Sequence, residues 1–304
     1  MAQDTETVDQ LRTRGASLAT VDQAQFQAAG FLIQMSLDWI ICRASENIDD
    51  FIGESHVTLI EEPLSRFVQA QALHDLRNLF SRLSGSTGIA RAYRVRLTDD
   101  RPRFDITFQV SEGRVLLEAA PSPKRGVGIA LGSVGGLIDS LGGRSGPALL
   151  EGAARRLRAL TGYDQCSIQY GDQSAHSSRE SSSDTANIVD LPGILADTAD
   201  APVAIFPHRP GDHSLARALL RSPSPESLLQ LRVHQICSAM SIPLTFEGQT
   251  VGRIRCESRS PVQPNIELHA AAELFAQMLA LRLEVDRLRG DQSSPSGGGV
   301  SAKR

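Results

Sequence analysis

The sequence predicts an α+β protein of two domains, each built from an antiparallel sheet with flanking helices. Runs of alternating apolar and polar residues, separated by short polar turns, predict the strands. Apolar residues at three- and four-residue spacing predict the helices. The chain has 304 residues, which is enough for two domains of ordinary size. Its content of 41% apolar and 22% charged residues is typical of a globular protein that folds in water.

The net charge, the lengths of the apolar runs and the spacing of the cysteines also argue against several classes of function. A net charge of −4 and a pI of about 6.0 argue against a nucleic-acid partner. No apolar run reaches the roughly 20 residues of a membrane helix, and the polar start at residues 1–8 is unlike a secretory signal. The cysteines are too widely spaced for a zinc site; they are Cys42, Cys166, Cys237 and Cys256. We therefore expect a cytoplasmic protein with no membrane partner and no metal.

After an N-terminal arm at residues 1–20, the first domain is expected to span residues 21–122. Ser45 and Gly53 are the expected start and stop of a short helix. The expected order is two strands, helices and three antiparallel strands, which is the order of a PAS domain. The elements are strands in 31–42, helices at 45–53 and 63–83, and strands at 90–97, 103–110 and 114–120.

Residues 123–146 are rich in Gly and Ser and predict a linker with a weak helix near Val134–Leu141. The second domain is expected at residues 147–286, followed by a disordered tail at 287–304. Its most regular part is a β-hairpin with a turn at Glu247-Gly248. The other expected elements are a helix at 147–160, a strand ending at 170, a disordered Ser-rich loop at 174–184, an extended loop at 202–210 and a long helix at 267–283.

Several stretches, in order, resemble the bacteriophytochromes, whose photosensory core is a PAS domain followed by a GAF domain. The motifs of the GAF domain are the clearest, because Leu160–Asp164 reads L-T-G-Y-D and Leu220–Pro225 resembles L-R-S-x-S-P. The other matching stretches are 26–30, for I-Q-P-H-G, then 194–207, 251–258, for W-G-L-I-A-C-H-H, and 271–283. The resemblance implies a PAS–GAF fold whose domains are joined by a phytochrome-type knot, in which the N-terminal arm passes through a lasso at 215–225.

The resemblance also implies which residues would line a bilin pocket in the GAF domain. Arg221 stands at the position that pairs a bilin propionate, and Ser224 and Ser241 are retained. Ser227 and Ser258 stand where the family has its two pocket histidines. Gln169 replaces a pocket tyrosine, and only Asp184 could supply the family's loop carboxylate. A simpler reading makes Arg221 a loop-capping residue, and Ser227 and Ser258 packing substitutes.

Because no cysteine occupies either attachment position of the family, we expect no covalent bilin and no cofactor. The first hypothesis is a stand-alone phytochrome-like sensory protein that acts on a regulatory protein, such as a histidine kinase or a transcription regulator. The alternative is a photoreceptor that holds biliverdin or a related tetrapyrrole non-covalently, through Arg221 and Ser241. The spacing of Leu281, Val285 and Leu288 predicts a homodimer through the C-terminal helix, unless this is only the outer face of the GAF core.

An enzymatic function is not expected. No His or Asp is spaced to activate Ser227 or Ser258 as a nucleophile. The histidines share no metal-ligand spacing. The expected mode of action is therefore binding rather than catalysis.

Overall fold

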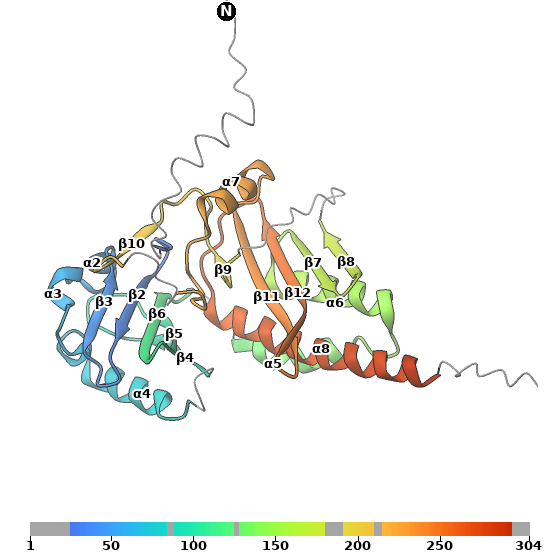
Figure 1. Ribbon diagram of the computed structural model, residues 1–304, viewed down its shortest axis with the longest axis horizontal. Coiled ribbons are helices and arrows are strands. Elements are labelled where there is room, and N and C mark those ends of the chain that lie inside the picture. The colour runs from blue at the N-terminus through green and yellow to red at the C-terminus, as the bar shows by residue number, and fades with distance from the viewer. Residues whose placement is uncertain (1–24, 84–87, 125–127, 180–190, 210–214, 294–304) are drawn as a thin grey trace, which may run out of the picture. The chain divides into compact units, whose positions relative to one another are not determined.

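The computed structural model describes residues 25–293, except 84–87, 125–127, 180–190 and 210–214. The chain divides into two compact units, and each has its own sheet (Figure 1). The first unit holds residues up to 122 together with 200–223. The second unit holds residues 123–199 and those from 224 onward. The expected N-terminal arm at 1–20 lies outside the described residues. No helix of the described part is long and apolar enough to cross a membrane.

The first unit is a seven-stranded sheet in the order β1-β10-β3-β2-β6-β5-β4, and its named pairs are antiparallel. The strands are β1 (Gln25–Phe26), β2 (Phe31–Met35), β3 (Ile41–Ser45), β4 (Ile89–Val95), β5 (Phe104–Ser111), β6 (Arg114–Pro121) and β10 (Val203–Phe206). The helices are α2 (Ile48–Ile52), α3 (His56–Leu59), η1 (Leu64–Arg66) and α4 (Ala70–Phe80). The predicted stop is confirmed, because Gly53 caps α2 in the left-handed conformation.

The two faces of this sheet differ because side chains alternate along each strand. One face carries the apolar core, where Phe31, Phe104 and Phe108 pack with the helices. The opposite face is also buried but is largely polar. Its polar members include Gln34, Arg43, Asp105, Thr107, Gln109 and Glu118. A buried polar face requires hydrogen-bonding partners, and residues 200–223 supply several of them.

Residues 202–210 were expected to be an extended loop, and this expectation is wrong for part of the segment. Strand β10 inserts between β1 and β3, where its backbone groups are paired on both sides. On the other side of β1, the N–H of Gln27 donates to the carbonyl of Leu220 (3.1 Å), and that of Ser222 donates to Gln25 (2.9 Å). Residues 25–27 therefore lie between two parts of the 200–223 segment.

The second unit is a five-stranded sheet in the order β8-β7-β12-β11-β9 (Figure 1). Its strands are β7 (Gln165–Tyr170), β8 (Gln173–Ser178), β9 (Ile194–Leu195), β11 (Ser238–Phe246) and β12 (Gln249–Ser258). Its helices are α5 (Gly128–Asp139), α6 (Gly146–Thr161), α7 (Pro225–Val233) and α8 (Ile266–Ser293). The predicted hairpin turn is confirmed, because Glu247 and Gly248 both have the positive φ of a type I′ turn.

The core of this unit lies between the sheet and helices α5, α6 and α8. Leu149 and Leu157 on α6 and Phe275 and Leu279 on α8 are fully buried there. A smaller apolar cluster on the other face joins α7 to β9 and β11. Its members are Leu191, Leu195, Leu228, Leu231, Ile236 and Ala239.

Three boundaries of the second unit differ from those expected. The weak helix expected near Val134–Leu141, within the linker at 123–146, is present as α5, but it begins earlier, at Gly128, and it joins the core through Val134 and Ile138. The loop expected from Ser174 begins instead as strand β8, which pairs along β7. The long helix extends ten residues beyond Leu283, into the expected tail.

Candidate functional site

The candidate site lies on the face of the second unit's sheet that points away from α6 and α8. Met240 on β11, Ile254 on β12 and Ile168 on β7 point into the core. Their strand neighbours therefore point to the opposite side. We call this side the polar face, and its members are Gln165, Ser167, Gln169, His176, Ser241, Arg253, Arg255 and Glu257.

One row of the polar face crosses four strands. Ser241 lies opposite Arg255, which lies opposite Ser167, and Ser167 lies opposite His176. Residues directly opposite on neighbouring antiparallel strands have Cβ atoms about 5 Å apart. Both ring nitrogens of His176 are buried and have no hydrogen-bond partner among the described residues. A cation and hydrogen-bonding groups therefore share one row of the sheet.

A buried ion pair lies at the centre of the polar face. The guanidinium of Arg255 donates through Nη2 to Oε1 of Glu257, and the side chains are only 11% and 2% exposed. Gln165 donates through Nε2 to the other carboxylate oxygen, Oε2, at 2.6 Å. Two charges so far from water are tolerated only because they neutralise each other and are further hydrogen-bonded.

A pocket of about 520 Å³ opens where these strands end, beside the turn between α7 and β11. Its lining combines both signs of charge with polar groups. The lining residues include Asp164, Gln165, Arg179, His234, Glu257 and Arg259. Such a mixed lining suits a polar ligand better than an extended apolar one.

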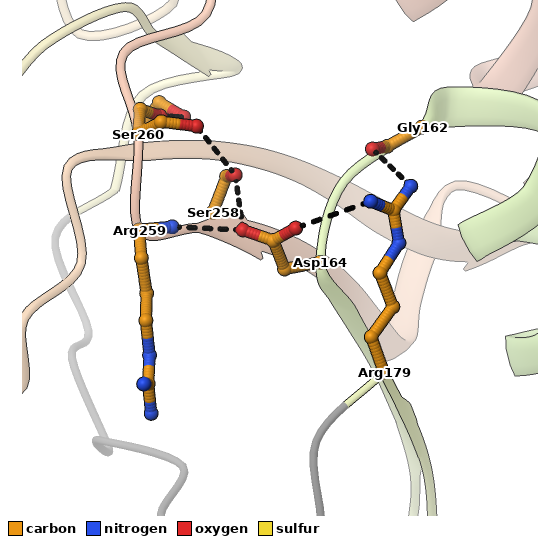
Figure 2. A network of polar contacts seen from close by, with 7 residues as sticks. Gly162, Asp164, Arg179, Ser258, Arg259 and Ser260 are labelled. Carbon is orange, nitrogen blue, oxygen red and sulfur yellow. Dashed lines mark hydrogen bonds and ion pairs between the residues drawn. The ribbon is translucent and has the colours of Figure 1, made fainter.

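Asp164 organises one wall of the pocket (Figure 2). Its Oδ2 accepts from the hydroxyl of Ser258 (2.5 Å) and from the backbone N–H of Arg259 (3.0 Å). Its Oδ1 lies 3.6 Å from the guanidinium of Arg179, which also donates to the carbonyl of Gly162 (3.2 Å). The Ser258 hydrogen bond, followed by the Arg259 N–H, lowers the pKa of Asp164, against the opposing effect of burial.

Replacing Asp164 by asparagine is expected to lower the free energy of unfolding by about 1–2 kcal/mol, because the amide cannot accept all of these donors. Since the folded pKa is below the ordinary 3.8, the contribution of the carboxylate is present above that pH and is lost as pH falls through the folded value. Urea unfolding at pH 7 and pH 3 measures both effects. D172N, at an exposed aspartate of the same unit, is the control. Equal losses in the two variants would contradict this role.

The five residues expected in a bilin pocket fall into two groups. Arg221 belongs to the first unit, where its carbonyl accepts from the Gln27 amide (3.1 Å). The second unit holds the other four. These are Ser224, Ser227, Ser241 and Ser258. That all five line one ligand pocket stays a prediction.

Each of the four serines has a definite place in the second unit. Ser224 caps α7, since its hydroxyl accepts from the Ser227 N–H (3.2 Å) and donates to the Ser227 hydroxyl (2.9 Å). Ser241 is 8% exposed on the polar face, and its N–H donates to the carbonyl of Gly193. Ser258 lies two residues after Cys256 and therefore on the core-facing side of β12, where its hydroxyl donates to Asp164. Its neighbour Glu257 lies on the polar face instead.

The sequence reasoning missed Arg255, Glu257, Gln165 and His176 as members of the site. The signal was present in β12, where charged residues alternate with the apolar Ile254 and Cys256. His176 was missed because residues 174–184 were expected to form a loop, whereas His176 lies in strand β8. Asp184, the candidate loop carboxylate, lies outside the described residues.

Two of the four cysteines, which are far apart in the sequence, lie next to each other in the structure. Cys256 lies opposite Cys166 in the core, and both are fully buried. Hydrogen bonding to Cys256, together with burial, raises the pKa of Cys166 well above its usual range. Cys166 is therefore held as a neutral thiol, which is a poor nucleophile. Cys237 is half-buried at the start of β11.

Comparison with known proteins places this geometry in context. Residues 147–285 match the model of the GAF domain family. No curated protein matches the sequence. The chromophore-binding domain of an unusual bacteriophytochrome from R. palustris has a TM-score of 0.73 and 20% identity, over 89% of this chain and 97% of that one. The photosensory core module of the Stigmatella aurantiaca phytochrome has a TM-score of 0.73 and 22% identity, over 88% of this chain and 59% of that one.

A third structure, the chromophore-binding domain of Stigmatella aurantiaca phytochrome P1, gives a TM-score of 0.71 with 22% identity, over 85% of this chain and 95% of that one. At such identities the likeness establishes the fold alone. The predicted fold class and the resemblance are confirmed at that level. Residues 147–285 are therefore a GAF domain, and the chain as a whole has a phytochrome-like PAS–GAF fold.

Proposed function

We propose that the chain is a phytochrome-like sensory protein that attaches no bilin covalently and signals by binding a regulatory protein, such as a histidine kinase or a transcription regulator. The observation that supports this most is the buried Arg255–Glu257 ion pair on the polar face. A tetrapyrrole is a large, mostly apolar ring system and binds in apolar pockets with few polar groups. A charged pair in the middle of the sheet is a poor surface for it.

The cysteines support the absence of covalent attachment, which requires an accessible thiolate. Cys166 and Cys256 are enclosed in the core on the helix-covered face. Cys42 lies in β3 of the first unit. Cys237 is the half-buried thiol of the second unit, and it is therefore the one to test.

Co-expression with a source of biliverdin, followed by a denaturing gel stained for zinc-induced bilin fluorescence, tests this proposal. The wild type is expected to show no fluorescent band. The C237A variant is the matched control, and it is expected to behave in the same way. A fluorescent wild-type band that disappears in C237A would overturn the proposal and identify Cys237 as the attachment residue.

A second function is a photoreceptor with a non-covalent tetrapyrrole. It is favoured by the likeness to structures named as chromophore-binding domains and by Ser241 on the polar face. Absorption spectra of the native, co-expressed protein test it. A visible band that is lost on denaturation and in R221A supports this function, whereas a colourless wild type rejects it.

We also propose that the chain acts without catalysis and as a homodimer. The Ser227 and Ser258 hydroxyls bond to Ser224 and Asp164, so neither has the histidine partner of an activated nucleophile. Helix α8 carries large apolar side chains that are 36–57% exposed, at alternating spacings of four and three residues. They are Leu274, Met278, Leu281, Val285 and Leu288, and we call them the α8 stripe. This heptad spacing is that of a helix that pairs with another helix.

A further inference from the structure

Strand β4 is the last strand of the first unit's sheet, and arginines follow one another along it. Residues 89–103 hold five arginines and two aspartates, in a chain whose net charge is −4. The arginines are Arg91, Arg94, Arg96, Arg101 and Arg103, and we call them the arginine edge. All of them except Arg91 are exposed. A local excess of positive charge on an otherwise acidic chain attracts acidic groups.

The charges of the arginine edge are poorly neutralised within the protein. The guanidinium groups of Arg94 and Arg96 form no hydrogen bond or ion pair with the residues that the structure describes. Arg101 and Arg103 donate to backbone carbonyls, those of Asp50 (3.0 Å) and Arg94 (3.1 Å). A carbonyl carries no net charge, so these contacts position the arginines and leave their charge in place.

A β-bulge fixes the backbone of Arg94. The register of β4 on β5 shifts between Ala92 and Val95, and Arg94 has a φ of 56°. Asp105 on β5 holds this conformation, because its Oδ1 accepts from the N–H of Arg94 (2.9 Å) and from the hydroxyl of Ser122 (2.5 Å). A bulge changes the direction of the side chain that it carries. Arg94 is therefore presented by a fixed backbone, which lowers the entropy cost of binding through it.

The outer side of β4 is open to an added strand. It pairs with β5, and no other strand of the described residues lies beside it. An edge strand presents backbone N–H and C=O groups that a further extended chain can pair with. Two copies of this edge would repel each other, because their arginines would be brought together. An acidic chain is attracted by the same charges, so the edge selects for such a partner.

We propose that the arginine edge docks an extended acidic segment of another protein, which adds to the sheet as a strand beside β4. Val95 and Leu97 pack against the apolar core, so Arg96 between them lies on the opposite side of the sheet, as Arg91 does. An extended chain spans about 15 Å between these two arginines, which is farther than one small anion reaches.

The spacing of an extended acidic segment fits this surface. Its side chains on one face recur about every 7 Å, so successive carboxylates can meet successive arginines. The inference rests on the proposed function for the existence of a regulatory partner, and it describes the segment by which that partner docks.

Fluorescence anisotropy with a labelled peptide of alternating glutamate and threonine tests the docking site on the full chain. The wild type is expected to bind the peptide, with a Kd that rises with salt because exposed charges are screened. R94Q/R96Q is expected to raise the Kd about tenfold, which corresponds to about 1.4 kcal/mol for two exposed charge contacts. R155Q/R289Q removes two exposed arginines of the second unit and is the matched control, which should leave the Kd unchanged.

Two further ligands separate strand addition from attraction between charges alone. A fully N-methylated form of the peptide keeps its carboxylates but has no backbone donor, and it is expected to bind more weakly. A short single-stranded oligothymidylate is also expected to bind more weakly, because it has no amide groups to pair with β4. Equal or tighter binding of either ligand, equal effects of the two double variants, or a wild type that does not bind the parent peptide would overturn the proposal.

Amide hydrogen exchange of the wild type measures strand addition directly. The peptide is expected to slow exchange in Ile89–Val95 and to leave it unchanged in β8, which is an edge strand of the second unit. Unchanged exchange in β4 would overturn the proposal. A regulatory protein that binds the wild type and R94Q/R96Q equally would also overturn this docking site, but it would leave the proposed signalling function standing.

Discussion

R255M is expected to lower the free energy of unfolding by about 3–5 kcal/mol, the largest loss that we predict for a single substitution. The methionine fills much of the same space but leaves the carboxylate of Glu257, which is 2% exposed, without its cation. Gln165 alone cannot compensate for a buried negative charge. Urea unfolding at pH 7, followed by circular dichroism, measures the loss.

The double variant R255M/E257L separates the loss of an interaction from the cost of an unpaired charge. Replacing both partners of a buried pair by apolar residues is often nearly neutral. We therefore expect the double variant to recover most of the stability lost in R255M. R259M, at an exposed arginine just after the same strand, is the control and should cost less than about 1 kcal/mol. If R255M also costs so little, the polar face is open to water and the argument against a tetrapyrrole fails.

L281E is expected to convert a dimer of the 32.8 kDa chain into a monomer. Leu281 is the most exposed member of the α8 stripe, at 57%. In a symmetric helix pair the substitution places two carboxylates in an apolar seam, and an unpaired buried charge costs several kcal/mol. A weakening of at least about 100-fold in Kd follows from a cost of only about 3 kcal/mol. Sedimentation equilibrium over a range of concentrations measures it.

L229E makes the same chemical change at an apolar residue of α7 that is 62% exposed and lies off the stripe. This control is expected to leave the association unchanged. Equal effects of L281E and L229E would indicate a general loss of structure rather than a lost interface. A wild-type chain that sediments as a monomer at every concentration would exclude the dimer.

Elements with a local signal could be predicted from the sequence. The hairpin of β11 and β12 follows from alternation around Glu247-Gly248, and α6 and α8 follow from apolar residues at helical spacing. Ser258 and Ser241 were found only through their place in family motifs. The resemblance gave their positions but not the direction of their side chains, which the pleat decides.

Elements that depend on distant partners could not be predicted in this way. Strand β10 has only four residues and is a strand because β1 and β3 pair with it, far away in the sequence. Helix α5 was predicted only as a weak helix near Val134–Leu141, because its several glycines disfavour a helix, and its full length forms against α8 in the core. The ion pair of Arg255 and Glu257 was missed because charged residues in a strand usually face water.

The return of residues 200–223 to the first sheet also limits how the protein can be dissected. No single peptide bond can be cut to leave each unit whole, because the chain passes from one to the other three times. A fragment that began at residue 147 would carry β10 without the strands on either side of it. A fragment that ended at residue 122 would expose Glu118 and leave an edge of β3 unpaired. Neither unit can therefore be exchanged as a simple terminal cassette.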